Sequence, residues 1–279
     1  MRRLLQIARE DVLDAARDRE LYVIGVVFLL VGLGIGYFLG NASPEPPDNA
    51  VALFTLGALT FFGSISAIAL SYNRVVGKRA SGELRVLLSL PFSRFETVYG
   101  AFLGRWAMLT SLSVGTIVTA AALAALLGAP VAVGPLLAAV VTVAALLAVF
   151  TSLSIGLSAG SVNTTRAAAG AFGLFILFLF RLWEVAPAGV RYVLNGFERP
   201  EGPSPAWAEA WGQIAPIAGA RNAIADSFPE LAGVLTSWAP STGDSTPVYA
   251  EPWFGAVVVA VWIVAPVTLG YLRLRKADL

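Results

Sequence analysis

The sequence contains neither cysteine nor histidine among its 279 residues. Without cysteine, a disulfide framework and thiolate chemistry are excluded, and without both residues the usual zinc and haem ligand sets are missing. The absence of histidine also excludes histidine acid–base catalysis. Only two methionines are present, Met1 and Met108, so a soft metal ion would find almost no sulfur ligands. We therefore expect neither a metal site nor a resident cofactor on this chain.

Charged side chains are scarce as well. They make up 13% of the residues, against 57% for hydrophobic ones, whereas a typical soluble domain has about 25% charged residues. This balance indicates an integral membrane protein whose main surroundings are lipid. The net charge of +1 does not favour nucleic acid as a partner.

Long apolar runs are abundant. A helix needs about 20 apolar residues to cross the hydrocarbon core of a bilayer, and runs of roughly this length occur at 21–40, 50–72, 106–128, 131–158, 167–183 and 253–272. The sequence therefore predicts an all-α membrane protein with six transmembrane helices. Residues 1–20, 73–105 and 184–252 are the longest segments outside these runs.

The distribution of Lys and Arg predicts the orientation of the chain. Residues 1–20 hold five arginines and residues 73–105 hold six basic residues, whereas the connections 41–49 and 128–131 hold none. Positive residues near span ends stay on the cytoplasmic side. We therefore expect a multi-pass protein of the plasma membrane with both termini and residues 73–105 in the cytoplasm, and with residues 184–252 outside.

The segment before the first run has helical periodicity of its own. Leu5, Ala8 and Val12 share one face, while charged residues occupy the other. This pattern predicts an amphipathic helix within residues 1–20 that lies along the inner membrane surface, and a solvated cytoplasmic helix is the alternative.

Small residues recur in the first run at Gly32, Gly36 and Gly40, which form two overlapping G-x-x-x-G steps. Such steps let helices approach closely. We expect these glycines to pack against a helix of the same chain or of a second subunit.

Two motifs of enzymes are present only in part. The stretch Gly156–Gly160, GLSAG, fits the G-x-S-x-G pattern of serine hydrolases. Lysine is the only nitrogen base left for such a serine, and both lysines fall in segments predicted to be cytoplasmic, so we interpret the stretch as a helix-packing element. Gly77-Lys78 is followed by Arg79, so there is no phosphate-binding G-x-x-x-x-G-K-[ST] loop. Any ATP that drives this protein must be hydrolysed by another chain.

The cytoplasmic segment 73–105 has a helix–break–helix pattern. Ser81 can cap a short helix that Pro91 ends, and Ser93-x-x-Glu96 forms a capping box for the next helix. Within the short helix Leu84, Leu87 and Leu88 share a face, flanked in sequence by Arg79, Arg85 and Arg94. We expect this apolar ridge to dock into a cytoplasmic partner. A connector that rests on anionic lipid headgroups is the alternative.

The run Arg79 to Arg94, RASGELRVLLSLPFSR, resembles the signature of ABC-2-type transporter permeases, and in particular permeases of nitrous-oxide-reductase and multi-copper-enzyme maturation systems. The resemblance implies that this segment is a coupling helix that contacts a separate ATPase subunit, which binds ATP and magnesium. It also implies a second permease copy or a paralogue as a partner. The implied coupling residues are Arg79, Ser81, Gly82, Glu83, Leu84, Leu87, Leu88, Pro91, Ser93 and Arg94.

The same resemblance implies a second, shorter coupling element at residues 161–170. Asn163 or Thr164 can also be an ordinary cap of the fifth helix, and both interpretations remain open.

The external segment 184–252 contains two apolar patterns of helical spacing. The first is formed by Trp207, Trp211 and Ile214, and the second, after Pro229, by Leu231, Val234, Leu235 and Trp238. Tryptophan favours the membrane interface, so we expect two short amphipathic helices at the outer leaflet. An ordinary cap outside the membrane is the alternative.

These features predict the permease subunit of an ABC transporter that works by alternating access, with export implied by the family resemblance. Three alternatives remain: a membrane component that passes the work of the ATPase to an external protein such as a metalloenzyme maturation factor, a membrane anchor or sensor, and a transporter driven by an ion gradient.

Overall fold

The computed structural model describes residues 2–15, 19–89, 92–199, 201–202, 204–235 and 247–277. All regular secondary structure within these residues is helical, which confirms the predicted all-α fold. Pro91 and Trp238 lie outside the described residues. The helices are α1 (Arg2–Ala15), α2 (Arg19–Gly40), α3 (Ala50–Ser71), α4 (Arg74–Ala80), α5 (Glu83–Ser89), α6 (Arg94–Leu126), α7 (Val133–Gly160), α8 (Thr164–Leu179), α9 (Leu182–Leu194), α10 (Ala206–Gln213), α11 (Pro216–Ile224), α12 (Pro229–Val234), the 3-10 helix η1 (Val248–Ala250) and α13 (Pro252–Arg275).

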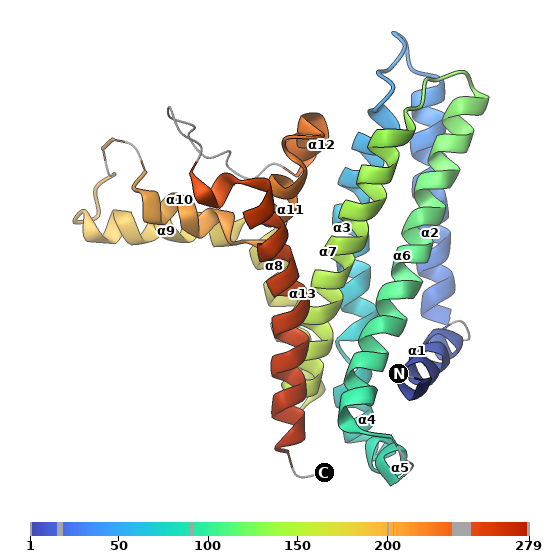
Figure 1. Ribbon diagram of the computed structural model, residues 1–279, viewed down its shortest axis with the longest axis vertical. Coiled ribbons are helices and arrows are strands. Elements are labelled where there is room, and N and C mark those ends of the chain that lie inside the picture. The colour runs from blue at the N-terminus through green and yellow to red at the C-terminus, as the bar shows by residue number, and fades with distance from the viewer. Residues whose placement is uncertain are drawn as a thin grey trace.

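Five helices are long and apolar enough to cross a membrane: α2, α3 together with α4, α6, α7 and α13. The fifth apolar run behaves differently, because α8 and α9 form a pair bent by 76°, so that α9 points away from the bundle (Figure 1). The 16 residues of α8 reach about 24 Å, which is less than the ~30 Å core of a bilayer. The run predicted as a span at 167–183 therefore falls on a broken helix, and the described residues contain five candidate spans, or six if the bent pair is counted as one.

The break follows Phe180, where Arg181 adopts a left-handed backbone conformation with φ of 62°. An aromatic cluster holds the bend. Trp183 stacks on Trp211 with ring centroids 4.5 Å apart, and each indole N–H donates to the backbone carbonyl of the other tryptophan, at 2.9 and 3.0 Å. Phe178 at the end of α8 packs against Trp262 of α13, with centroids 5.0 Å apart. The bend is thus fixed by residues distant in the sequence.

Helix α7 lies at the centre of the bundle, where it packs against α3, α6 and α13. Its contact with α13 is very close, because a side chain at Gly156 or at Gly270 would collide with the backbone of the other helix. Ser152 Oγ accepts a hydrogen bond from Val267 N at 3.2 Å, next to Pro266, which lies inside α13. Small and hydroxylated residues therefore join these two helices, as is typical of helix contacts in lipid.

The same principle joins α2 to α6. A Cβ atom at Gly32 would lie 2.7 Å from Thr116 O, and one at Gly36 would lie 2.7 Å from Ala120 O. Gly40 packs against the Leu127 side chain. The G-x-x-x-G steps of the first span are therefore occupied by a helix of the same chain.

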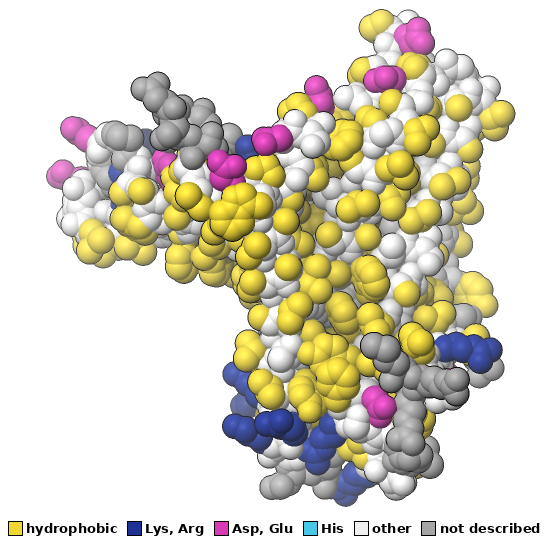
Figure 2. All heavy atoms as spheres, in the orientation of Figure 1, with side chains coloured by type: hydrophobic (Ala, Val, Ile, Leu, Met, Phe, Trp, Pro, Cys, Tyr) yellow, Lys and Arg dark blue, Asp and Glu magenta, His cyan; other side chains and the backbone are white. Residues whose placement is uncertain are grey.

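Both termini lie at the same end of the bundle as α4 and α5 (Figure 1). Lys and Arg side chains gather at this end, whereas most of the visible Asp and Glu side chains lie at the opposite end (Figure 2). We call the two ends the basic end and the acidic end. Helix α6 begins at Arg94, well before the apolar run at 106–128, so that it continues beyond the span at the basic end.

Near the acidic end, α11 packs against α7 and α13, α12 packs against α3, and α10 lies between α9 and α11. Helix α10 carries Trp207 and Trp211, so a helix forms at the first predicted pattern, and α12 forms within the described part of the second. Helix α11 was not predicted. Its buried Asn222 donates to Gln213 Oε1 at 2.9 Å and to Tyr249 O at 3.2 Å, and so ties α10, α11 and η1 together.

The glycines of α2 offer a matched test of the packing. Gly36→Val should lower the melting temperature of the purified chain, because overpacking against Ala120 costs about 1–3 kcal/mol. Gly34→Val on the same helix should have little effect, since no atom lies within 4 Å of the added Cβ. Thermal unfolding in detergent measures both, and equal melting temperatures for the two variants would contradict the assigned contact.

Candidate functional site

The segment predicted to be functional forms a compact unit at the basic end. Helix α4 continues α3 after a break of two residues, and α5 follows the turn at Ser81 and Gly82. Gly82 has φ of 79°, a conformation that glycine adopts at little cost. Glu83 N, at the first residue of α5, donates a hydrogen bond to Ser81 Oγ at 3.4 Å, in agreement with the predicted role of Ser81 as a cap of this helix.

The leucine face of α5 points into the bundle. Leu84 is 1% exposed and belongs to a core cluster with Val98 of α6, Ile155 of α7 and Leu274 of α13. Leu87 and Leu88, which are partly buried, pack against the same cluster. The expected outward apolar ridge is therefore wrong. These three leucines attach α5 to its own chain and leave the opposite face of α5 exposed.

That other face is short and mixed in character. Glu83, Arg85, Val86 and Ser89 are exposed, and Val86 is 67% exposed. An exposed apolar side chain flanked by charged and polar ones is a common arrangement at protein contacts. Arg79, the first residue of the predicted set, is half-buried on the preceding helix α4.

Helix α4 is held by α7. Ser158 Oγ accepts hydrogen bonds from Val75 N and Val76 N, both at 3.1 Å, so it satisfies two amide groups in the first turn of α4. Ser158 is the serine of the GLSAG stretch and is fully buried. The packing interpretation of that stretch is therefore confirmed, with an added role: its serine caps a neighbouring helix.

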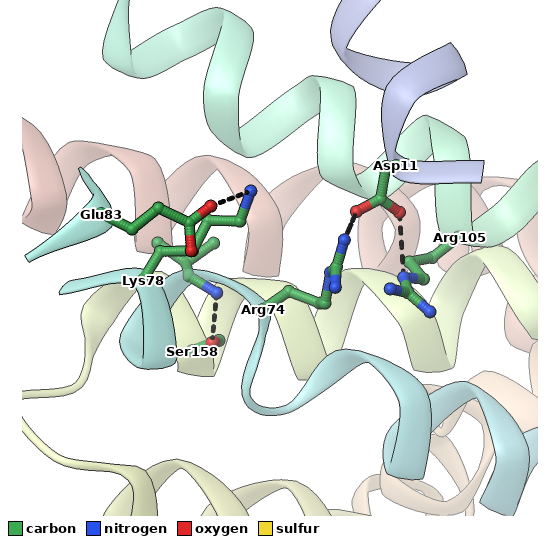
Figure 3. A network of polar contacts seen from close by, with 7 residues as sticks. Asp11, Arg74, Lys78, Glu83, Arg105 and Ser158 are labelled. Atoms are coloured by element: carbon green, nitrogen blue, oxygen red, sulfur yellow. Dashed lines mark hydrogen bonds and ion pairs between the residues drawn. The ribbon is translucent and has the colours of Figure 1, made fainter. Parts of the chain in front are cut away.

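A buried ion-pair network joins three helices beside this cap (Figure 3). Asp11 of α1 is 4% exposed and Arg105 of α6 is 2% exposed; Arg105 Nε lies 2.9 Å from Asp11 Oδ2. Arg74 Nε of α4 donates to Asp11 Oδ1, also at 2.9 Å. On the far side of α4, Lys78 Nζ pairs with Glu83 Oε1 at 3.1 Å and closes the α4–α5 turn.

This network was missed in the sequence. In the sequence, Arg74 and Arg105 contributed only to the basic residues that predict the cytoplasmic side, and no function was predicted for Asp11. One signal was available: Asp11 follows Ala8 by three residues, so it interrupts the apolar face of an amphipathic helix. Gly100 and Gly104 of α6 have no side chain, which lets α1 lie directly on α6.

The predicted capping box is present at the start of α6. Ser93 Oγ accepts from Glu96 N at 3.1 Å, and Glu96 Oε2 accepts from Ser93 N at 2.8 Å. Arg94, by contrast, points toward the end of α13. Its guanidinium donates to Leu274 O, Arg275 O and Ala277 O, at 2.6, 3.0 and 2.9 Å. A cation at carbonyls without helical partners stabilises a helix C-terminus, so Arg94 links the segment to the last span.

The second element predicted at residues 161–170 is the start of α8. Asn163 is its N-cap, and its side chain accepts from Arg166 N at 2.8 Å. The ordinary helix-start interpretation is thus confirmed for Asn163. Val162, just before this cap, is 65% exposed at the surface of the molecule.

The arrangement is mechanical in character. Within the described residues, no group of three or more Asp, Glu, His or Cys side chains is placed to hold a metal ion. The polar atoms of the site instead cap helices and pair charges, so that α4, which leads into α5, is connected to α1 and α7.

Asp11→Ala should strongly destabilise the chain. It leaves the buried Arg105 without the carboxylate, and removing one partner of a buried ion pair costs about 3–5 kcal/mol. Asp14→Ala, one turn later on the exposed side of α1, is the matched control. Thermal unfolding and proteolysis of α1 report the difference. If the two variants unfold at the same temperature, the ion-pair network does not stabilise the chain as proposed.

Comparisons with known proteins agree with this architecture. A profile of the family described as ABC-2 family transporter protein matches residues 5–279. A probable ABC transporter permease protein NosY of Pseudomonas aeruginosa is 29% identical over 203 residues, which cover 70% of this chain and 73% of that protein. A protein of the same description from Stutzerimonas stutzeri is 32% identical over 188 residues, which cover 64% and 67% of the two chains. The chain therefore belongs to the ABC-2 family and is a transmembrane permease subunit of an ABC transporter.

Proposed function

We propose that the exposed face of α5 receives a cytoplasmic ATPase subunit, and that two permease chains, identical or paralogous, export a substrate by alternating access. The observation that carries the proposal is the division of α5 into two faces. Leu84 is buried in the bundle, whereas Arg85 and Val86 face outward. A helix fixed on one side and exposed on the other can receive a force and pass it on.

The contacts around α5 define the path of this force. Leu84 reaches α6, α7 and α13 through a packed core cluster, and Arg94 holds the end of α13. Ser158 and Asp11 add α7 and α1. Because packed interiors deform little, a displacement of α5 should move these helices as one body. Alternating access would then arise from rotation of one permease chain against the other.

In this proposal the basic end faces the cytoplasm of a cell bounded by the plasma membrane, and ATP with magnesium binds to the ATPase subunits. The concentration of Lys and Arg at one end supports this orientation (Figure 2). This chain itself performs no covalent chemistry in the cycle.

Val86→Glu tests the contact with the ATPase. The variant should fold normally, because Val86 is 67% exposed, but it should bind the co-expressed ATPase subunit at least about tenfold more weakly, as expected for a charge placed in the centre of an interface. Val248→Glu is the matched control, since this valine is 61% exposed on η1, outside the spans. Affinity purification through the permease, followed by ATPase assays, gives the comparison. Equal recovery of the ATPase with both variants would refute the assigned face.

Orientation can be tested separately because the chain lacks cysteine. A single cysteine at Val86 should resist a membrane-impermeant maleimide in intact cells and react after the membrane is opened. A single cysteine at Val248 should react in intact cells. Labelling with the opposite pattern would reverse the proposed topology.

A further inference from the structure

A groove of about 370 Å³ runs between α7, α8 and α13. Its size lies within the range of small-molecule sites in proteins. Its walls are apolar apart from one residue, Arg273, which lies at the basic end. The lining residues are Leu153, Gly156, Leu157, Leu174, Val261, Trp262, Ala265, Pro266, Leu269, Gly270 and Arg273.

Trp262 lines the end of the groove farthest from Arg273, and the groove is exposed along its side. At the end of the groove away from Arg273, Trp262 contacts Phe178 with ring centroids 5.0 Å apart and so joins α13 to α8. Val261 and Leu269 of its rim are 55% and 61% exposed. These side chains belong to a span and face the surroundings of the bundle, so the groove opens toward lipid.

The length of the groove matches one leaflet of a bilayer. Trp262 and Arg273 are eleven residues apart on α13, which corresponds to a rise of about 16 Å. Half of a hydrocarbon core is about 15 Å. An acyl chain that enters beside Arg273 would therefore reach the aromatic pair at mid-membrane.

The charge at the mouth suits an anionic headgroup. The Arg273 side chain lies across the end of α7, where its Cδ is 3.2 Å from the position of a Cβ on Gly160, a space that any other residue would fill. Arg273 is exposed, and a guanidinium at the membrane interface binds phosphate readily. The N-terminus of α8, which starts four residues after Gly160, adds positive potential on the same side.

We propose that this groove binds an anionic phospholipid from the leaflet at the basic end, with its phosphate at Arg273 and one acyl chain between α8 and α13. The lipid would act as a wedge that sets the separation of these two helices. This inference does not depend on the contact of α5 with an ATPase, so the two can fail independently.

Photocrosslinking tests the site. The full chain is reconstituted into vesicles of phosphatidylcholine that contain phosphatidylglycerol with a diazirine at the end of one acyl chain. We expect adducts on the segments 153–157 and 261–270. Arg273→Gln should reduce their yield about fivefold, as for the loss of one basic residue at an anionic surface, whereas Arg275→Gln, which removes the same charge beside the groove, should change the yield less than about twofold.

Two further crosslinking experiments test the headgroup and the position of the acyl chain. A phosphatidylcholine probe with the same diazirine should label these segments several-fold less than phosphatidylglycerol, and equal labelling would overturn the assignment of an anionic headgroup. Ala265→Phe, which fills the groove and leaves Arg273 in place, should abolish the adducts. Adducts that persist in this variant, or that are absent from the unaltered chain because a second copy covers the groove, would overturn the site.

Discussion

The buried carboxylate of Asp11 is the point on which the basic end of the bundle depends. It forms ion pairs with Arg74 of α4 and Arg105 of α6, while α1 lies against Gly100 and Gly104 of α6. The buried guanidinium of Arg105 would be costly without this carboxylate, so Asp11 holds α1 and α6 together and draws the partly buried Arg74 of α4 to the same point. The position of α4 then fixes the turn at Gly82, and the turn fixes the direction in which α5 presents its outer face.

Local patterns predicted the parts of this site that local interactions form. The box of Ser93 and Glu96 appears as expected, because both partners lie within one turn of a helix. The leucines of α5 show the limit of such patterns. Spacing tells which residues share a face, and Leu84, Leu87 and Leu88 do share one, but it cannot tell whether that face meets the same chain or another. The two arginines paired with Asp11 are distant in sequence, and no spacing rule connects them.

The fifth apolar run shows a second limit. Its hydropathy continues to Trp183 without glycine or proline near the break, so composition predicts a span. The structure bends the chain at Arg181 because Trp183, Trp211 and Trp262 offer stacking and hydrogen bonds at that level of the bundle. Two of these tryptophans belong to other helices. The other predicted spans fall on α2, α3, α6, α7 and α13, which are each long and apolar enough to cross a membrane.

The helices of the chain differ in how firmly they are joined to one another. Helices α1, α6, α7 and α13 are joined by buried charges, helix caps and backbone contacts through glycine, which resist relative motion. Helix α8 is joined to α13 near the C-terminus of α8, where Phe178 contacts Trp262, and the groove separates the two helices toward the basic end. A change in the angle of α8 therefore disturbs few directional bonds, and α9 would follow it through the rigid bend. If a lipid occupies the groove as proposed, it fills the space between α8 and α13. The lipid composition of the membrane then influences the position of α8 and α9.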